Sequence, residues 1–304
     1  MVASVTRLLF FAWFVILAAL LACGAQLGWP AGVWIGLYVL VLGHPTMLAV
    51  EFALARRVGR RANGVAAPLA SLVRAWFGEW RMSTIAFGWR MPWRSTAWPD
   101  HLPRSARGLR GVVFVHGYLC NRAIWNPWLA RLTKLDRAFV AVSLEPVFGD
   151  IEGYADTIER AVRRVETVTG LAPIVVAHSM GGVAARAWLR TREGHATSHG
   201  HEHAARVITI GTPHRGTWLA GLALSSNAKQ MRTGGAWMAA LQAAETPDHA
   251  AMFTSWWSDC DQIVFPPPTA VLAGSESHQV RGVAHLALVD REEIWAELRR
   301  RIDS

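Results

Sequence analysis

One stretch of this 304-residue chain lacks charge altogether, because no Asp, Glu, Lys or Arg occurs from Leu8 to Val50. A helix of that length, rising 1.5 Å per residue, would extend about 65 Å, roughly twice the ~30 Å hydrocarbon core of a bilayer. Helix-breaking residues interrupt the stretch near its middle: Gly24, Gly28, Pro30 and Gly32. The sequence therefore predicts a transmembrane hairpin within residues 1–61, with spans of about 8–27 and 31–50 joined by a tight uncharged turn.

Cysteine is also scarce, with only Cys23, Cys120 and Cys260 in the chain. Three cysteines exclude the disulfide framework that holds many small secreted domains together. Cys120 and Cys260 could meet near the functional site, but we expect unpaired thiols if the domain that carries them is cytoplasmic.

Acidic residues are in deficit, 22 against 31 basic ones, and the resulting net charge of +9 comes almost entirely from arginine. Such a surplus can indicate nucleic-acid binding. Nothing else in the chain resembles a nucleic-acid-binding module, so we expect no nucleic-acid partner. Much of the positive charge instead flanks the uncharged stretch, where it would contact anionic lipid headgroups.

The arginines also orient the predicted hairpin. Arg7 precedes it, its central turn carries no charge, and four arginines follow it: Arg56, Arg57, Arg60 and Arg61. By the positive-inside rule both ends face the cytoplasm, which predicts a multi-pass protein of the inner membrane with the remainder of the chain on the cytoplasmic side. The alternative is a cleaved signal peptide, or a lipoprotein signal ending at Cys23, and the second long apolar segment argues against both.

A connector rich in tryptophan and arginine, residues 62–109, follows the hairpin. Its indoles are Trp76, Trp80, Trp89, Trp93 and Trp98. The segment 69–80 fits a helix with one apolar face made of Leu69, Leu72, Val73, Trp76, Phe77 and Trp80. Such a face suits the headgroup layer of a membrane, and packing against the following domain is an equally good interpretation.

From residue 110 onward, short β-branched runs alternate with helical segments. We expect strands at 112–116, 139–143, 174–178, 207–211 and 270–273, and helices at 123–135, 154–169, 182–192 and 292–302. Runs that are apolar throughout indicate strands buried on both faces, and their alternation with helices indicates a doubly wound, mostly parallel α/β sheet. Residues 110–304 would form this domain, with its site beyond the carboxyl ends of the strands.

The segment from Val175 to Gly182 has the shape of a strand–turn–helix that presents one hydroxyl. A β-branched run ends at Ser179, and a helix-compatible segment follows at once. Small residues lie two positions to either side, Ala177 and Gly181, where larger side chains would clash with the crossing elements. Ser179 is therefore the candidate nucleophile.

A nucleophilic serine needs a base and an acid that orients the base, in the chain order serine, acid, histidine for this kind of fold. His285 lies in the loop before the closing helix and is the predicted base, whereas His278 is expected to begin the last strand. Asp261, in a loop placed before the strand expected at 270–273, is the predicted acid and Asp259 the runner-up. The remaining acids in the interval are Glu202, Glu245, Asp248 and Glu276.

An oxyanion produced by serine attack needs N–H donors. We expect one from Met180, directly after the nucleophile, and one from Tyr118, in the loop after the first strand. Gly117 would let the backbone of this loop approach the substrate. We expect His116 and His178 to hold the loop and the elbow by hydrogen bonding.

With these motifs in place, residues from about 110 to 302 resemble an α/β-hydrolase of the bacterial lipase and esterase type. The alanine-headed elbow Ala-His-Ser-Met-Gly at 177–181 is similar to that of small bacterial triacylglycerol lipases, and the motifs at 116–118, 211–217, 261–264 and 282–288 also fit. The resemblance implies hydrolysis of an apolar carboxylic ester through an acyl-serine, without metal or organic cofactor. Acyl transfer, thioester or amide cleavage by the same residues, and a non-catalytic membrane scaffold of the same fold, are the alternatives.

Two further segments are open to more than one interpretation. A histidine cluster at 194–203 could bind a metal, but no well-placed carboxylate or cysteine completes the set. The apolar segment 218–253 could form a lid that contacts an acyl chain or could simply pack on the domain.

Overall fold

The fold is described from a computed structural model that covers residues 2–63, 67–193 and 206–304. Within these residues six parallel strands form one sheet in the order β2-β1-β3-β4-β5-β6. The strands are β1 (Val112–Val115), β2 (Phe139–Ala141), β3 (Ile174–His178), β4 (Arg206–Ile210), β5 (Phe253–Ser258) and β6 (Glu276–Val280). The predicted doubly wound α/β class is confirmed.

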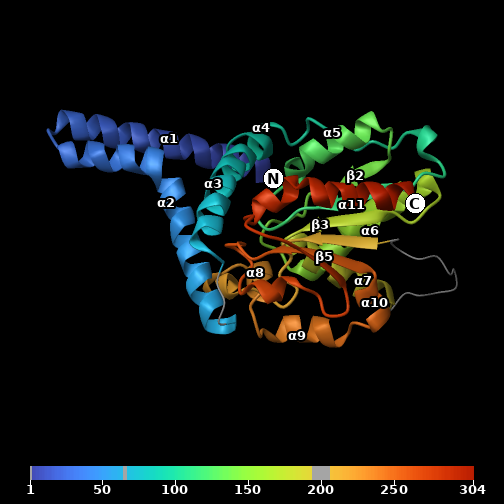
Figure 1. The fold of residues 1–304 in the computed structure, drawn as a ribbon. Helices are drawn as coiled ribbons and strands as arrows, with labels where there is room; N and C mark the ends of the chain where they lie inside the picture. Colours follow the sequence, from blue (N-terminus) through green and yellow to red (C-terminus); the bar gives the residue numbers. More distant parts are fainter. Residues whose placement is uncertain (1, 64–66, 194–205) are drawn as a thin grey trace.

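Helices cover both faces of the sheet (Figure 1). Alternate residues of β1 show why: Val113 and Val115 pack in the cluster that includes α6 (Ala155–Thr169) and α7 (Met180–Glu193). Val112 and Phe114 pack on the opposite face with α5 (Asn126–Lys134) and α11 (Glu292–Asp303). Short helical turns connect these elements: η2 (Arg104–Ala106), η3 (Arg122–Trp125), η4 (Ile151–Tyr154), η6 (Pro267–Ala270) and η7 (Leu286–Asp290).

The expectation for the second half of the sheet was wrong in one place. Residues 270–273, predicted as a strand, instead form the end of the turn η6 and the loop after it and pair with no strand, whereas β5 lies earlier, at Phe253–Ser258. The reason is physical, because β5 combines aromatic side chains with Ser and Thr instead of a β-branched run. Asp261 consequently lies in the loop between β5 and β6, and His278 lies in the middle of β6 instead of beginning it.

The segment between β4 and β5 folds into short helices, η5 (Trp218–Leu222), α8 (Ser226–Gln230), α9 (Ala236–Ala243) and α10 (Pro247–Ala251). Met238 and Leu241 on its inner side are buried in the core that includes α6 and α7. Leu222 and Leu224 on its outer side are exposed. The segment therefore packs on the domain and also presents apolar side chains outward.

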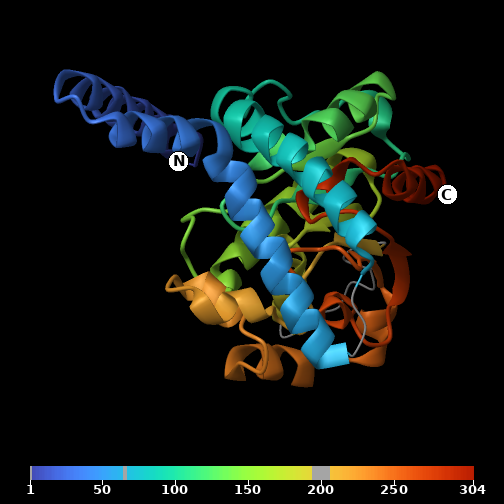
Figure 2. The same ribbon diagram turned by 60° about the vertical axis from the view of Figure 1, so that its left-hand side comes forward.

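The N-terminal region is helical, with α1 (Val2–Gln26), α2 (Pro30–Asn63), α3 (Leu69–Ile85), the π-helical turn η1 (Ala86–Arg90) and α4 (Met91–Trp93). Helix α1 and the first part of α2 project from the domain as a hairpin, and α2 then bends and runs across the domain beside α3 (Figures 1 and 2). Pro45 lies inside α2, and a proline removes a helical hydrogen bond and kinks the helix. Helix α2 thus extends beyond the span predicted at about 31–50, and the part of α2 that follows the bend lies on the domain.

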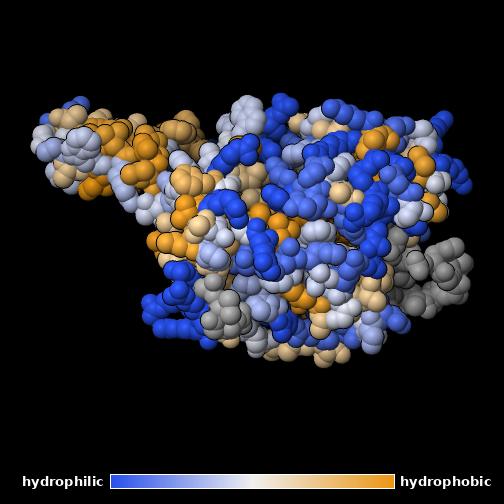
Figure 3. Space-filling view, viewed as in Figure 1, coloured by the Kyte–Doolittle hydropathy of each residue, from blue (hydrophilic) through white to orange (hydrophobic). Residues whose placement is uncertain are grey.

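Both N-terminal helices are long and apolar enough to cross a membrane, and few of their residues are buried. In the space-filling view the projecting hairpin is largely apolar, whereas the domain surface facing the viewer is largely hydrophilic (Figure 3). This contrast agrees with the predicted spans.

Helix α3 confirms the helix expected at 69–80, but a different face is buried. Leu72, Ala75, Glu79, Met82 and Ser83 face inward. Most of the predicted apolar face, Leu69, Val73, Phe77 and Trp80, remains exposed. The indole of Trp76 donates a hydrogen bond of 2.9 Å to the Pro45 carbonyl, which joins α3 to the interior of α2.

Candidate active site

Ser179 occupies a sharp turn between β3 and α7. Its φ of 55° lies in the left-handed region, which is strained for a residue with a side chain. Its backbone N–H donates to the Ile210 carbonyl of the neighbouring strand at 2.8 Å, which fixes the turn. A Cβ on Gly181 would lie 2.6 Å from the His116 carbonyl oxygen, so only glycine fits there. The strain and the crowding match the elbow expected from the sequence.

Asp261 and His285 meet beyond the ends of β5 and β6. His285 Nδ1 lies 2.8 Å from Asp261 Oδ2, and both side chains are buried. The other carboxylate oxygen of Asp261 accepts the backbone N–H groups of Ile263 and Val264 at 2.8 and 2.7 Å. Because Asp261 Oδ1 accepts two N–H groups, the carboxylate is held in one orientation, and His285 Nδ1–H donates to it.

The other acids proposed from the sequence have different partners. Asp259 accepts the Gly282 N–H, Glu245 pairs with the buried Arg186, and Glu276 pairs with Arg206 and Arg301. Asp248 is exposed on α10, and Glu202 lies outside the described residues. His278 contacts Glu276 and stacks on Trp256 instead of approaching Asp261. The geometry thus favours Asp261 over Asp259 and His285 over His278.

The pKa of His285 reflects opposing influences. Burial lowers it, but the Asp261 carboxylate and its hydrogen bond raise it, as do the more remote carboxylates of Glu79 and Glu51, and the net direction is upward. A raised pKa makes the imidazole a better proton acceptor.

The loop after β1 lies against Ser179. A Cβ on Gly117 would lie 2.8 Å from the Ser179 Cβ, so the missing side chain lets the backbone approach the nucleophile. His116, with its pKa lowered to about 4 by burial, accepts the Leu144 N–H at Nε2 and donates from Nδ1 to the Gly117 carbonyl. In the part of the chain that the structure describes, neither the Tyr118 N–H nor the Met180 N–H donates a backbone hydrogen bond. Both are therefore available to a ligand.

His178 packs against the predicted base. Its ring lies 4.6 Å from that of His285, and its Nε2 lies 3.4 Å from the His285 carbonyl oxygen. Burial and the nearby His285 keep the pKa of His178 well below its usual range. A neutral His178 supports the histidine loop without competing for the proton.

Gly211 lies next to both the turn that carries the nucleophile and the acid–base pair. This residue follows Ile210, the acceptor of the Ser179 N–H, and a Cβ on it would lie 3.1 Å from His285 Nδ1. Among the described residues no hydrogen bond joins the Ser179 hydroxyl to His285. Such bonds are often long in ligand-free sites and shorten when a substrate is bound.

Two residues that the sequence did not single out complete the surroundings of His285. Gln262 accepts the His285 N–H at 3.1 Å through Oε1 and donates at 2.8 Å from Nε2 to Glu79 on α3. The Glu79 carboxylate also accepts the N–H groups of Leu286 and Ala287. Gln262 lies within the acid-loop motif at 261–264, whereas Glu79 belongs to no recognisable motif and only the fold brings it near the histidine loop.

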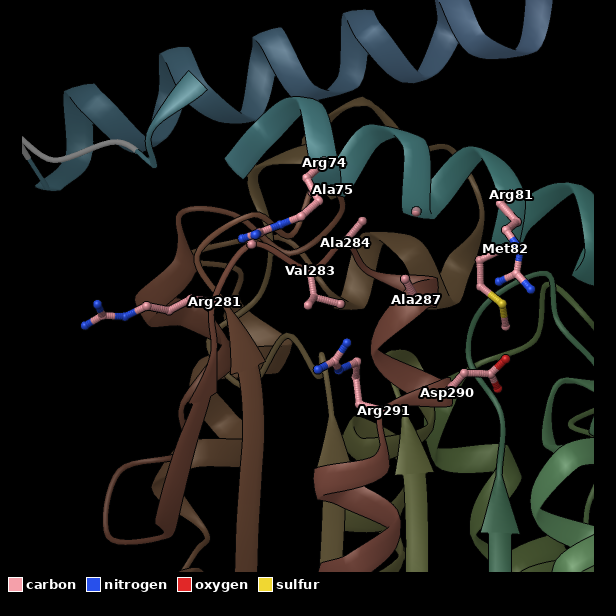
Figure 4. A pocket seen from close by; sticks show the side chains of 12 residues that line it. Arg74, Ala75, Arg81, Met82, Arg281, Val283, Ala284, Ala287, Asp290 and Arg291 are labelled. Carbon is pink, nitrogen blue, oxygen red and sulfur yellow. The ribbon is translucent and has the colours of Figure 1, made fainter. Parts of the chain in front are cut away.

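Helix α3 also bounds two cavities beside the acid–base pair. One of about 490 Å³ lies between α3 and residues 281–291, and the other, of about 550 Å³, borders Asp261 and the second part of α2. Figure 4 shows the first cavity, with Arg74, Arg81, Arg281 and Arg291 around it. Ser179 lines neither of these two cavities.

The histidine cluster at 194–203 lies outside the described residues. The residues that are described contain no group of three or more His, Cys, Asp or Glu side chains placed to hold a metal. All three cysteines are free thiols.

Comparisons with known proteins place the fold in a family. The family model for the alpha/beta hydrolase family matches residues 112–302. A Bacillus licheniformis lipase in its mature form superposes with a TM-score of 0.55 at 17% identity, covering 64% of this chain and 92% of that one. Aspergillus fumigatus lipase B gives 0.52 at 16% identity, covering 65% of this chain and 53% of that one. No curated protein sequence matches the chain.

At such identities the two lipases show a common fold. The family match extends over more than half of the chain and includes the elbow, the acid loop and the histidine loop. The predicted resemblance is therefore confirmed, and the chain belongs to the alpha/beta hydrolase family.

Proposed function

We propose that this protein is a membrane-anchored serine hydrolase that cleaves apolar carboxylic esters. The observation that carries the proposal is the buried Asp261–His285 pair beside a serine held at positive φ. Both compared lipases share the fold, and the elbow at 177–181 is of the kind found in small bacterial lipases.

In the proposed reaction Ser179 Oγ attacks the ester carbonyl carbon while its proton passes to His285 Nε2. Asp261 holds the resulting imidazolium by the hydrogen bond to Nδ1. The Tyr118 and Met180 N–H groups donate to the oxyanion. The bond from carbon to the alkoxy oxygen then breaks, and the alcohol leaves with the proton from His285.

Water completes the cycle. It gives a proton to His285 and adds its oxygen to the acyl carbon, after which the serine–acyl bond breaks and Ser179 regains the proton. The acid is released, and no metal or organic cofactor is needed for either half of this sequence.

We further propose that α1 and the projecting part of α2 cross the inner membrane, with the catalytic region on the cytoplasmic side and residues 62–109 as the connector. The exposed apolar stripe of α3 (Leu69, Val73, Phe77 and Trp80) then lies near the membrane surface, where tryptophan is favoured. Membrane lipid would thus be a partner, and apolar esters would reach the site by partitioning into the bilayer.

Two experiments test these proposals. A fluorophosphonate probe and p-nitrophenyl esters of graded chain length would be applied to the full chain in liposomes and to Ser179→Ala. We expect labelling and ester cleavage only with Ser179 present, and equal activity in the variant refutes the mechanism.

Protease added outside intact cells should leave the catalytic region intact, and its digestion would refute the topology.

A further inference from the structure

The buried carboxylate of Glu79 is unusual for its position. It lies on α3, in the connector, and only 4% of the residue is exposed. Removing an ionised group from water is costly unless hydrogen bonds replace the lost water. The question is therefore what Glu79 does that outweighs this cost.

Every hydrogen-bond partner of its carboxylate is an N–H donor from the two loops that hold the acid–base pair. Oε1 accepts Gln262 Nε2 at 2.8 Å, and Oε2 accepts the N–H groups of Leu286 and Ala287 at 3.0 and 3.1 Å. A carboxylate accepts only, whereas a protonated acid must also donate. The donor set therefore fits the ionised form, although burial raises the pKa of Glu79.

These contacts fix His285 from behind. Leu286 and Ala287 directly follow His285 at the start of η7, and Gln262 directly follows Asp261. Gln262 joins the two loops, because its Oε1 accepts the His285 N–H while its Nε2 donates to Glu79. One side chain from α3 thereby sets the relative position of the loops that carry the acid and the base.

Small residues let α3 come close enough for this. Ala75 on α3 and Ala284 in the histidine loop are buried in one cluster, together with Leu72, Phe52 and Cys260. Figure 4 shows Ala75 on α3 above Ala284 and Ala287 on the histidine loop. A larger side chain at these positions would move the helix outward and take Glu79 away from the loop.

The same helix is attached to the hairpin. The Trp76 indole donates to the Pro45 carbonyl at 2.9 Å, and Ser83 Oγ lies 3.2 Å from His44 Nε2. Both contacts are made to the interior of α2. A continuous set of contacts therefore links the proposed membrane anchor to His285.

We propose that Glu79 is a positioning residue for the ester hydrolysis proposed above, and that the N-terminal region is an integral part of the active site. Glu79 aligns the Asp261 and His285 loops and places a second negative charge behind the imidazole. This charge stabilises the imidazolium that forms when Ser179 gives up its proton. The inference rests on the proposed function, because it assigns Glu79 a role beside His285, the base of the proposed reaction.

The charged and titratable groups around His285 determine the pH behaviour. They are Asp261 after β5, Glu79 on α3, Glu51 on α2 and His178 at the end of β3. The three carboxylates raise the pKa of His285. His178 is uncharged and therefore exerts no Coulombic effect on that pKa. Because the base must be neutral to act, removing the charge of Glu79 should move the acid limb of the pH–rate profile to lower pH.

Glu79→Gln in the full chain, reconstituted in liposomes, is the decisive variant. We expect kcat to fall about 10- to 100-fold through misalignment of the base, with little change in KM. The acid limb should shift down by on the order of one pH unit. Glu79→Asp keeps the charge on a shorter side chain, so it should restore the acid limb and recover only part of kcat.

Glu297→Gln provides the matched control, because the Glu297 side chain is equally buried but pairs with Arg300 and Arg301 on α11. It should leave kcat and the acid limb unchanged. An unchanged Glu79→Gln enzyme, or one with lower kcat and an unmoved acid limb, overturns the inference while an inactive Ser179→Ala still upholds the proposed function. If Ser179→Ala retains activity, the proposed function itself fails.

Discussion

The catalytic region and the N-terminal region differ in which side chains their helices expose and bury, and two helices show the difference. Helix α6, in the catalytic region, buries Ile158, Val162 and Val165 and exposes arginines to water. Helix α3, in the N-terminal region, exposes Val73 and Phe77 and buries Glu79. Water is the natural neighbour of the outer face of α6, whereas the outer face of α3 suits an apolar or interfacial medium.

The difference is what the proposed membrane contact of the N-terminal region predicts. In the catalytic region, burial of apolar strands brings the polar ends of those strands together, and Ser179, Asp261 and His285 converge there. In the N-terminal region the buried carboxylate of Glu79 faces the loops that carry Asp261 and His285. Glu79 therefore links the N-terminal region directly to the loops of the acid–base pair.

The largest effect should come from Asp261→Asn, a nearly isosteric change in the catalytic region. The amide cannot stabilise the imidazolium or hold the productive tautomer, so we expect kcat to fall by about 10⁴. Asp259→Asn, two residues earlier, is the control, and it should retain most of the activity because Asp259 contacts Gly282 instead of His285. Ester hydrolysis measured at one pH suffices, and equal losses in the two variants would contradict the assignment.

Sequence reasoning could identify this acid because chain order and loop composition are local properties. The apolar strands β1, β3 and β4 were predicted for the same reason, since burial on both faces leaves a continuous β-branched run. Strand β5 was missed because its Ser and Thr side chains interrupt the apolar pattern, and β6 is an edge strand with polar side chains exposed.

Glu79 could not have been found in that way. It lies 183 positions from Gln262 and 207 from Leu286, and no motif connects them. For the apolar face of α3 the sequence left two interpretations, the membrane headgroup layer and packing on the domain, and the exposure of Leu69, Val73, Phe77 and Trp80 disfavours packing for most of that face.

A smaller loss should follow Gly117→Ala. The added Cβ would lie 2.8 Å from the Ser179 Cβ, so the oxyanion loop or the nucleophile must shift. Losing one well-placed donor costs about 100- to 1000-fold in kcat. Gly78→Ala on α3 is the matched control from the other region: its Cβ meets nothing within 4 Å, and alanine favours a helix. Gly78→Ala should keep full activity. If it lost as much activity as Gly117→Ala, the two regions would not respond differently to an added methyl group.

Stability provides a third test. The guanidinium of Arg186 in α7 is buried, donates to both oxygens of Glu245 and also to the His214 carbonyl. Arg186→Met leaves the Glu245 carboxylate without its guanidinium partner and should lower the free energy of unfolding by roughly 3–5 kcal/mol. Arg90→Met instead removes the solvent-accessible pair with Asp290 that joins the N-terminal region to η7, and it should cost about 1 kcal/mol or less. Chemical denaturation of both variants in detergent measures the difference, and equal costs would contradict the burial argument.

The smallest effect on catalysis should come from the outer face of α3, where Phe77 is exposed. An environment-sensitive dye on Phe77→Cys, in a Cys23→Ser background, should report an apolar surrounding in liposomes, because the other two cysteines are buried and stay unlabelled. The same dye on Arg163→Cys, which replaces an exposed residue of α6, should report water. Hydrolysis of a soluble ester should change less than about twofold in both proteins, since neither side chain contacts the site. Two equally water-exposed dyes would mean that the apolar stripe of α3 does not face lipid, and the contrast between the two helices would then need another cause.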